Sequence, residues 1–276
     1  MDSLAERLGH PPDARLLIIS SDRIGTTHAS TAAGYRALRE GAATTATIVM
    51  PGPWARHAAE QYRGEDVGVH LTLNAELDCF RWAPLTAAPS LLDGDGGFPR
   101  TVTDLWDHAD LDEVRRECRA QLERAVLWGF DVTHLTTHMG AMQQRPEFFD
   151  VLLDLAVDFD LPIRLESGSA ESEAGFPFRR LAAEEGIVVP DHFQLIRGGA
   201  RSHLETRPAE LGAGVTELSL SPAIDASELR AIDPDADLRV DDLDLVIGDD
   251  LTGWIERAGA TPIGYHELRV AQRDRR

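Results

Sequence analysis

The sequence contains no lysine, because all 27 of its basic residues are arginine. This absence excludes reactions that need a lysine amine, such as Schiff-base catalysis and pyridoxal phosphate attachment, and it excludes the lysine of a phosphate-binding P-loop. Against 47 acidic residues, the formal net charge is −20. Nucleic acids and anionic membranes bind clustered basic charge. We therefore expect neither as a partner, and we expect a small-molecule substrate.

Cysteine and long apolar runs are also scarce. Cys79 and Cys118, the only two cysteines among the 276 residues, lie far apart and without CxxC spacing, so they indicate neither a disulfide framework nor a thiolate metal site. No run of about 18 apolar residues occurs, and residues 1–12 lack the pattern of a signal peptide. These features favour a cytoplasmic protein, and a homodimer is compatible with them.

Short apolar runs alternate with segments of helical spacing along almost the whole chain. This alternation predicts a parallel sheet wound by crossovers. The expected fold class is α/β, a single distorted TIM-like (β/α) barrel over residues 1–276, with a doubly wound open sheet as the alternative. The pattern predicts strands over 15–20, 44–50, 66–73, 131–137, 162–166, 187–190, 215–220 and 261–265, and helices over 31–40, 54–62, 111–128, 146–159, 178–185, 201–211 and 245–258.

A long insertion over residues 74–110 interrupts this alternation. Segments of this length without a regular pattern are often active-site loops. The Gly-Asp-Gly-Gly stretch at 94–97 does not join a strand to a helix, and the chain has no lysine to complete a P-loop. We expect that stretch to be a turn.

Four polar residues stand at or just beyond the expected ends of strands: Asp22, His70, His138 and Ser221. Active sites of (β/α) barrels are built at the carboxyl ends of the strands. One carboxylate and two imidazoles can hold Zn²⁺ or a similar ion with a position open for water. The alternative is structural, since an aspartate after a strand is commonly a helix N-cap. His134 lies about 13 Å from His138 along an extended strand, and we expect it to pack lower in the barrel.

Five stretches, at 16–41, 44–55, 64–76, 132–140 and 214–225, resemble in order and spacing the YdjC-like (ChbG/HpnK-type) carbohydrate deacetylases. They read LLIISSDRIGTTHASTAAGYRALREG, TTATIVMPGPWA, GEDVGVHLTLNAE, VTHLTTHMG and GVTELSLSPAID. The resemblance implies a distorted (β/α) barrel. It also implies a divalent metal, Zn²⁺ or Mg²⁺, that activates water to remove an acetyl group from an N-acetylated sugar.

Carried over by position, the resemblance makes Asp22 a general base and His70 and His138 metal ligands. Arg23 stands where the family has a metal-binding aspartate. A guanidinium stays charged and cannot coordinate a cation. We therefore expect metal binding to be weak or absent.

Two further positions depart from the family pattern. Thr136 replaces an aspartate and cannot orient an imidazole as a carboxylate would, although it can still form hydrogen bonds. Ser221 replaces a histidine and cannot protonate a leaving group near neutral pH.

Three functions remain open at this point. The first is a hydrolase of the deacetylase lineage that acts on a small, polar, N-acetylated sugar with a degraded metal site. The second is a metal-independent isomerase, lyase or cyclase of secondary metabolism, in which Arg23 clamps an anion, and the third is a catalytically inactive binding protein. Alternatively, Arg23 forms only a structural ion pair with Asp22. The candidate catalytic residues are Asp22, Arg23, His28 and Ser221, the candidate metal ligands are His70 and His138, and the candidate substrate contacts are Arg23 and Thr136.

Overall fold

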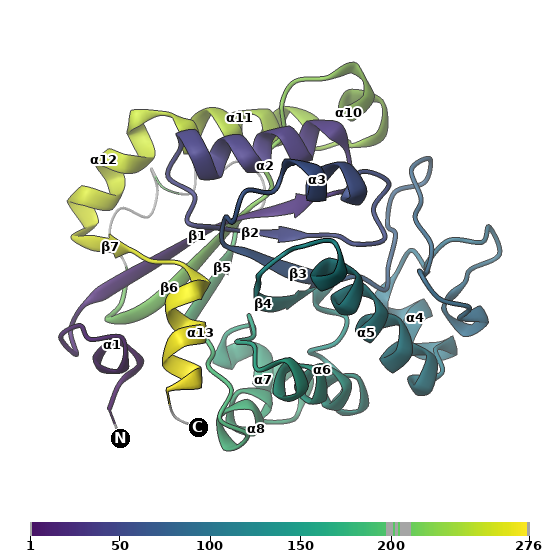
Figure 1. The fold of residues 1–276 in the computed structure, drawn as a ribbon, viewed down its shortest axis with the longest axis horizontal. Coiled ribbons are helices and arrows are strands. Elements are labelled where there is room, and N and C mark those ends of the chain that lie inside the picture. The colour runs from purple at the N-terminus through teal and green to yellow at the C-terminus, as the bar shows by residue number, and fades with distance from the viewer. Residues whose placement is uncertain (1, 197–200, 202–203, 205–210, 275–276) are drawn as a thin grey trace.

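A curled sheet of parallel strands forms the centre of the molecule (Figure 1). The structure is a computed structural model that describes residues 2–196, 201, 204 and 211–274. Every strand pair found in these residues is parallel, as the alternation of strands and helices predicts. The strands are β1 (Arg15–Ile24), β2 (Thr45–Ile48), β3 (Val67–Leu71), β4 (Val132–Thr137), β5 (His192–Leu195), β6 (Gly214–Leu220) and β7 (Ala260–Pro262).

Strand β1 lies at the middle of the sheet, in the order β4-β3-β2-β1-β6-β5, and β7 pairs with its first residues. The run from Leu16 to Ile19 is at most 1% exposed. Strands of a parallel sheet are covered on both faces, so a continuous apolar run is stable there. The same strand carries Asp22 near its carboxyl end, and the central core strand therefore positions a candidate site residue directly.

The sheet forms a half-barrel and is not closed within the described residues. Beyond β4 the curl continues only through a bridge between Leu135 and Ile163 and a hydrogen bond from Ile163 N to Val188 O of 3.1 Å. The prediction of regular strands over 162–166 and 187–190 is therefore wrong. Pro162 and Pro190 at the ends of these segments lack the N–H donor that a ladder needs. The α/β class with a curled parallel sheet is confirmed, whereas barrel closure is not.

Helices flank the sheet on two sides, with α2, α11 and α12 on one side and α5 to α8 on the other (Figure 1). Helix α2 begins after Thr27, whose hydroxyl accepts the N–H of Ser30 at 3.0 Å. In the described part of the chain, no helix has the length and apolar character required to cross a membrane. The helices are α1 (Leu4–Arg7), α2 (His28–Glu40), α3 (Ala55–Gln61), η1 (Pro89–Leu91), α4 (Val102–His108), α5 (Leu111–Leu127), η2 (His138–Gly140), α6 (Pro146–Phe159), α7 (Gly168–Ala174), α8 (Phe178–Glu184), α10 (Ser227–Ile232), α11 (Ala236–Ile247), α12 (Asp249–Ala258) and α13 (Tyr265–Arg273).

The C-terminal third differs most from the sequence expectation. The helix expected over 245–258 is two helices, α11 and α12, because Gly248 between them is extended (φ −90°, ψ 168°). The strand expected over 261–265 ends at Pro262, and α13 begins at Tyr265. Strand β5 is unpredicted, since its partly exposed sequence HFQL has no strong apolar pattern. The helix expected over 201–211 lies almost wholly outside the described residues.

The insertion over 74–110 is held firmly at the carboxyl end of β3. The start of the insertion is held against residue 99, where the Asn74 side chain donates to Pro99 O at 3.0 Å and Ala75 N donates to the same carbonyl at 3.0 Å. Glu117 of α5 also accepts the N–H of Leu85 at 3.0 Å. The residues that directly follow β3 therefore have a fixed position at this edge of the sheet.

His134 lies fully buried in β4, below the candidate site, as expected. Its ring stacks on Tyr265 with centroids 3.7 Å apart and planes 8° apart. Gly68 of β3 makes room for this stack, because a Cβ at position 68 would lie 2.4 Å from His134 Cε1. The backbone of β3 can approach β4 here only because residue 68 has no side chain.

We expect Gly68→Ala to lower the free energy of unfolding by about 1–3 kcal/mol, since the added methyl group overpacks the buried ring. Gly94→Ala is the matched control, because nothing lies within 4 Å of a Cβ there, and its effect should stay within about 0.5 kcal/mol. Urea denaturation measures both. Equal stability of the two variants would contradict the close approach at Gly68.

Candidate functional site

Polar side chains gather where β1, β3 and β4 end. His70 in β3 pairs in register with Thr136 in β4, and His138 follows β4 directly. All three side chains are buried, with His70 6% and His138 3% exposed. Because parallel strands end at the same edge of a sheet, these residues meet although they are far apart in sequence. Together with Glu76 and Arg23 they form what we call the carboxyl-edge cluster.

The two histidines of the cluster face each other through ring nitrogens. His70 Nε2 lies 3.2 Å from His138 Nδ1, and the rings are close to perpendicular, with an interplanar angle of 71°. On its other side, His70 Nδ1 lies 2.5 Å from Thr136 Oγ1. Burial, partly offset by the charge of Asp22, lowers the pKa of His70 to about 3. His70 is therefore neutral near pH 7.

Glu76 joins His138 to Arg23. Its Oε2 lies 2.8 Å from His138 Nε2, and its Oε1 accepts a hydrogen bond from Arg23 Nη2 at 3.0 Å. Burial alone would raise the pKa of Glu76, but His138 and Arg23 hold it well below its usual range. The carboxylate is thus ionised and accepts hydrogen bonds from both neighbours.

Asp22 belongs to a separate, deeper network. Arg164 donates to both of its oxygens, at 2.7 and 3.1 Å, and Ser219 Oγ donates to Oδ2 at 2.7 Å. Ser20 and Thr47 donate to Oδ1 at 2.8 and 3.0 Å. Although burial would raise its pKa, Arg164 keeps the pKa of Asp22 far below its usual range. With five hydrogen bonds on two oxygens, this carboxylate is saturated.

Arg164 links Asp22 to a second buried carboxylate. Its Nε donates to Glu217 Oε1 of β6 at 2.8 Å, and Tyr265 of α13 donates its hydroxyl to the other Glu217 oxygen. Arg164 is 4% exposed and Glu217 is completely buried. Burial raises the pKa of Glu217 despite the nearby guanidinium. One arginine is therefore shared as the counter-ion of two buried acidic groups.

The residues present do not fit a resident divalent metal ion. His70 Nε2 and His138 Nδ1 converge and could occupy two corners of such a site. A stable site needs at least a third protein ligand, and the described residues contain no group of three His, Cys, Asp or Glu suited to hold an ion. Asp22 is saturated by hydrogen bonds, and Arg23 brings a positive charge to the cluster.

Of the other candidate residues, Thr136 belongs to the cluster, whereas His28 and Ser221 contact residues outside it. His28 begins α2 and is exposed, with its ring centroid 5.1 Å from that of Trp54. Ser221 follows β6, where its carbonyl accepts a hydrogen bond from Arg239 Nε at 2.7 Å. Thr136 is completely buried behind His70. The suggested ion pair between Arg23 and Asp22 is wrong, since Arg23 pairs with Glu76 and Asp22 with Arg164.

Sequence reasoning missed two residues that organise the site, Glu76 and Arg164. Arg164 lies in the middle of the strand expected over 162–166, so the rule about strand ends that singled out Asp22 does not select it. Glu76 follows β3 by five residues, in the same stretch 64–76 that contains His70. An acidic residue shortly after β3 could have been noted as a candidate. The sequence does not show where the Glu76 side chain points, because this depends on how the insertion folds back.

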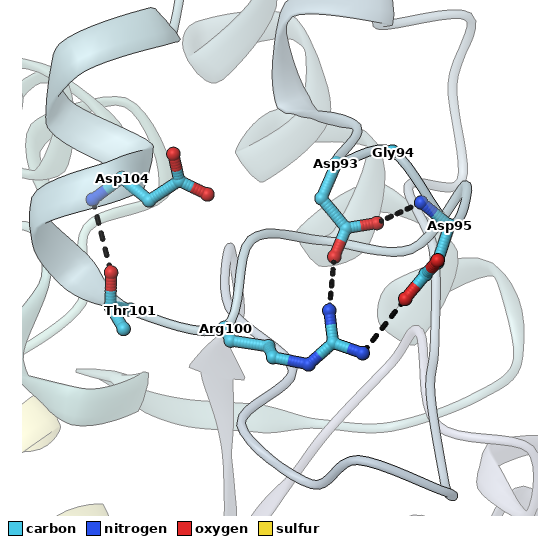
Figure 2. Close-up of a pocket in the computed structure, with 6 residues that line it drawn as sticks. All are labelled: Asp93, Gly94, Asp95, Arg100, Thr101 and Asp104. Atoms are coloured by element: carbon cyan, nitrogen blue, oxygen red, sulfur yellow. Dashed lines mark hydrogen bonds and ion pairs between the residues drawn. The ribbon is translucent and has the colours of Figure 1, made fainter.

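A pocket lies on the insertion and not at the carboxyl-edge cluster (Figure 2). It is lined by Asp93, Asp95, Arg100 and neighbouring residues. Arg100 donates to Asp93 at 2.9 Å and to Asp95 at 2.8 Å. These acidic groups are therefore already paired with a guanidinium, and the expected turn at 94–97 is part of this loop.

A parallel α/β sheet with polar side chains at its carboxyl edge is typical of proteins that bind small molecules there. Residues 16–257 match the model of the YdjC-like protein family. The chain belongs to this family.

Two relatives illustrate the extent of the similarity. The chain is 41% identical over 158 residues to a carbohydrate deacetylase of Thermus thermophilus, and this match covers 57% of the chain but only 56% of that protein. A carbohydrate deacetylase of Listeria monocytogenes is 24% identical over 258 residues, covering 91% of the chain and 99% of that protein. The chain therefore spans about half of the first relative and nearly all of the second.

A solved structure shares the fold. The protein from Enterococcus faecalis V583, provisionally described as a cellobiose-phosphate cleavage protein, matches with a TM-score of 0.79 and 23% identity, over 92% of this chain and 99% of that one. At this identity the match supports the half-barrel architecture alone.

We expect Arg164→Met to destabilise the protein by about 3–5 kcal/mol near pH 7, because it leaves two buried carboxylates without a counter-ion. Arg119→Met is the control, since its ion pair with Asp158 lies at the surface and contributes at most about 1 kcal/mol. In the variant, both carboxylates should titrate above their unfolded pKa values. Their protonated forms then favour folding at low pH, and this contribution is lost as the pH rises. Urea unfolding at pH 5 and pH 8 should therefore show the larger loss at pH 8, and a loss independent of pH would contradict the assignment.

Proposed function

We propose that this chain is a hydrolase of the carbohydrate deacetylase type, which removes an acetyl group from a small, polar, sugar-like substrate at the carboxyl-edge cluster. Membership of the YdjC-like family and the carbohydrate deacetylases among its relatives support the reaction class. The observation that carries the proposal is the imidazole of His138 held at 2.8 Å by the carboxylate of Glu76. A carboxylate that orients an imidazole is the arrangement of a general base.

In the proposed reaction, His138 accepts the proton of a water molecule as the water oxygen attacks the acetyl carbonyl carbon. Glu76 fixes the ring through Nε2, so Nδ1 is the basic nitrogen. The water must replace His70 as the hydrogen-bond partner of His138 Nδ1. Little free energy is lost in this exchange, because the 3.2 Å separation of the two nitrogens is long for a hydrogen bond. When the tetrahedral intermediate collapses, the bond to the sugar breaks and the imidazolium returns the proton to the leaving group. Acetate and the deacetylated sugar are the products.

Arg23 supplies the positive charge for this reaction. Its side chain is 28% exposed, and the hydrogen bond to Glu76 uses one of its five N–H donors. We propose that other donors of this guanidinium stabilise the oxyanion of the tetrahedral intermediate. No step passes through a metal ion, because the residues do not fit one.

The base role expected for Asp22 passes to His138 in this proposal. Five hydrogen bonds saturate the Asp22 carboxylate, and a strongly lowered pKa makes it a weak base. Asp22 then acts by holding Arg164 and the ends of β1 and β6 in place.

We expect Glu76→Gln to lower kcat at least about 100-fold with little change in KM, because the amide cannot stabilise the imidazolium. The measurement is acetate release from N-acetylglucosamine oligomers and from O-acetylated sugars, with EDTA present. Glu60→Gln is the matched control, since Glu60 forms only an exposed pair with Arg56, and it should keep full activity.

Two results would count against the proposal. The first is full activity of Glu76→Gln, and the second is a folded wild-type protein that releases no acetate from any acetylated sugar with or without added divalent ions. The second result together with tight sugar binding would favour a catalytically inactive binding protein.

A metal-independent isomerase, lyase or cyclase is the second candidate, and the partly exposed guanidinium of Arg23 is the observation that favours it. In that case Arg23 clamps a carboxylate or phosphate of the substrate through a two-pronged contact. Arg23→Gln should then weaken the binding of sugar acids or sugar phosphates at least about 10-fold in calorimetric titrations. Equal binding by wild type and Arg23→Gln would exclude the clamp.

A further inference from the structure

The nitrogens of His70 and His138 are spaced as for two ligands of one ion. Zinc–nitrogen bonds are about 2.0–2.1 Å, so two nitrogens at a tetrahedral angle lie about 3.3–3.4 Å apart. The observed separation is 3.2 Å. The outer nitrogen of His138 lies 2.8 Å from the carboxylate of Glu76, and metal-binding histidines commonly donate their outer N–H to a carboxylate. The outer nitrogen of His70 contacts the hydroxyl of Thr136.

The backbone at Arg23 is unusual for an arginine. Its φ of 74° lies in the left-handed region, which aspartate and asparagine adopt more readily than other side chains apart from glycine. Thr26 stabilises this turn, because its N–H and its hydroxyl both donate to the carbonyl of residue 23. Position 23 therefore has the conformation of a short polar residue but carries a long cation.

The charge of Arg23 is balanced inside the cluster. Its guanidinium pairs with Glu76 at 3.0 Å, and the same carboxylate bonds His138 at 2.8 Å. A divalent ion between the two histidines would meet this fixed positive charge. Glu76 does not offset this charge between the two histidines, because it bonds the Nε2 side of His138 and not the Nδ1 side that faces His70, and Asp22 is already paired with Arg164.

We infer that the Arg23–Glu76 ion pair takes the place of a divalent metal ion in this chain, and that Arg23 keeps cations from the two histidines because it brings a positive charge and no third ligand. The spacing of the two imidazoles and the backbone at position 23 suit a metal site, whereas the guanidinium of Arg23 does not. Replacing Arg23 by aspartate should therefore create a site of one carboxylate and two imidazoles.

The test is Zn²⁺ titration of tag-free protein by calorimetry, without substrate, for wild type, Arg23→Asp, Arg23→Asn and the double variant Arg23→Asp/His70→Gln. We expect Arg23→Asp to bind one Zn²⁺ at least about 100-fold more tightly than wild type. Arg23→Asn, which removes the repulsion without adding a carboxylate, should lie between them. The double variant should return to the wild-type affinity, and it also measures zinc held by surface histidines.

A second readout uses Co²⁺, whose visible absorption reports tetrahedral nitrogen and oxygen ligands. The absorption should develop in Arg23→Asp and not in wild type. Wild-type binding of one Zn²⁺ that is tight and depends on His70 would overturn the inference, and so would an unchanged affinity of Arg23→Asp. If Arg23→Asp fails to fold, Arg23→Asn carries the test, with a gain of at least about 10-fold expected and no gain overturning the inference. Because no substrate is present, failure here is distinguishable from failure of the deacetylation assay.

Discussion

The buried guanidinium of Arg164 is the interaction on which the rest of the site depends. It lies between Asp22 of β1 and Glu217 of β6, and it comes from the far wall of the curl, beyond β4. Among the described residues the sheet does not close by backbone hydrogen bonds, and this side chain connects the two walls of the half-barrel. Two buried carboxylates would be strongly unfavourable in the interior without it. Arg164 therefore both connects the walls of the half-barrel and acts as the counter-ion of the buried carboxylates.

This arrangement explains why the two charged networks of the site behave differently. The deeper one, around Arg164, is saturated, almost completely buried and suited to holding strand ends in place. The shallower one, from Thr136 through His70 and His138 to Glu76 and Arg23, is a chain of single hydrogen bonds with an exposed end. Chemistry that requires a proton to move belongs in the second network, because each of its members can exchange a partner without leaving a buried charge unpaired.

Much of the architecture follows from the sequence, because buried strands such as β1 contain short apolar runs that alternate with segments of helical spacing. The edges of the sheet cannot be predicted in the same way. Strand β5 is short and partly exposed, and the segments around Ile163 and Val188 are irregular. At the site, rules about strand ends locate Asp22, His70 and His138. They do not show which charges pair, because Arg23 and Glu76 are 53 residues apart and meet only through the folded insertion.

The central claim is that the carboxyl-edge cluster is a metal-free hydrogen-bond relay. The most direct measurement is the protonation of the ring nitrogens by ¹⁵N NMR at pH 8, before and after EDTA. Ionised Glu76 requires a proton on Nε2 of His138, so its Nδ1 must accept from Nε2–H of His70, and His70 Nδ1 must accept from Thr136. We predict these two neutral tautomers, unchanged by EDTA. Chemical shifts of metal-bound nitrogen at His70 Nε2 and His138 Nδ1 that disappear with EDTA would contradict the account.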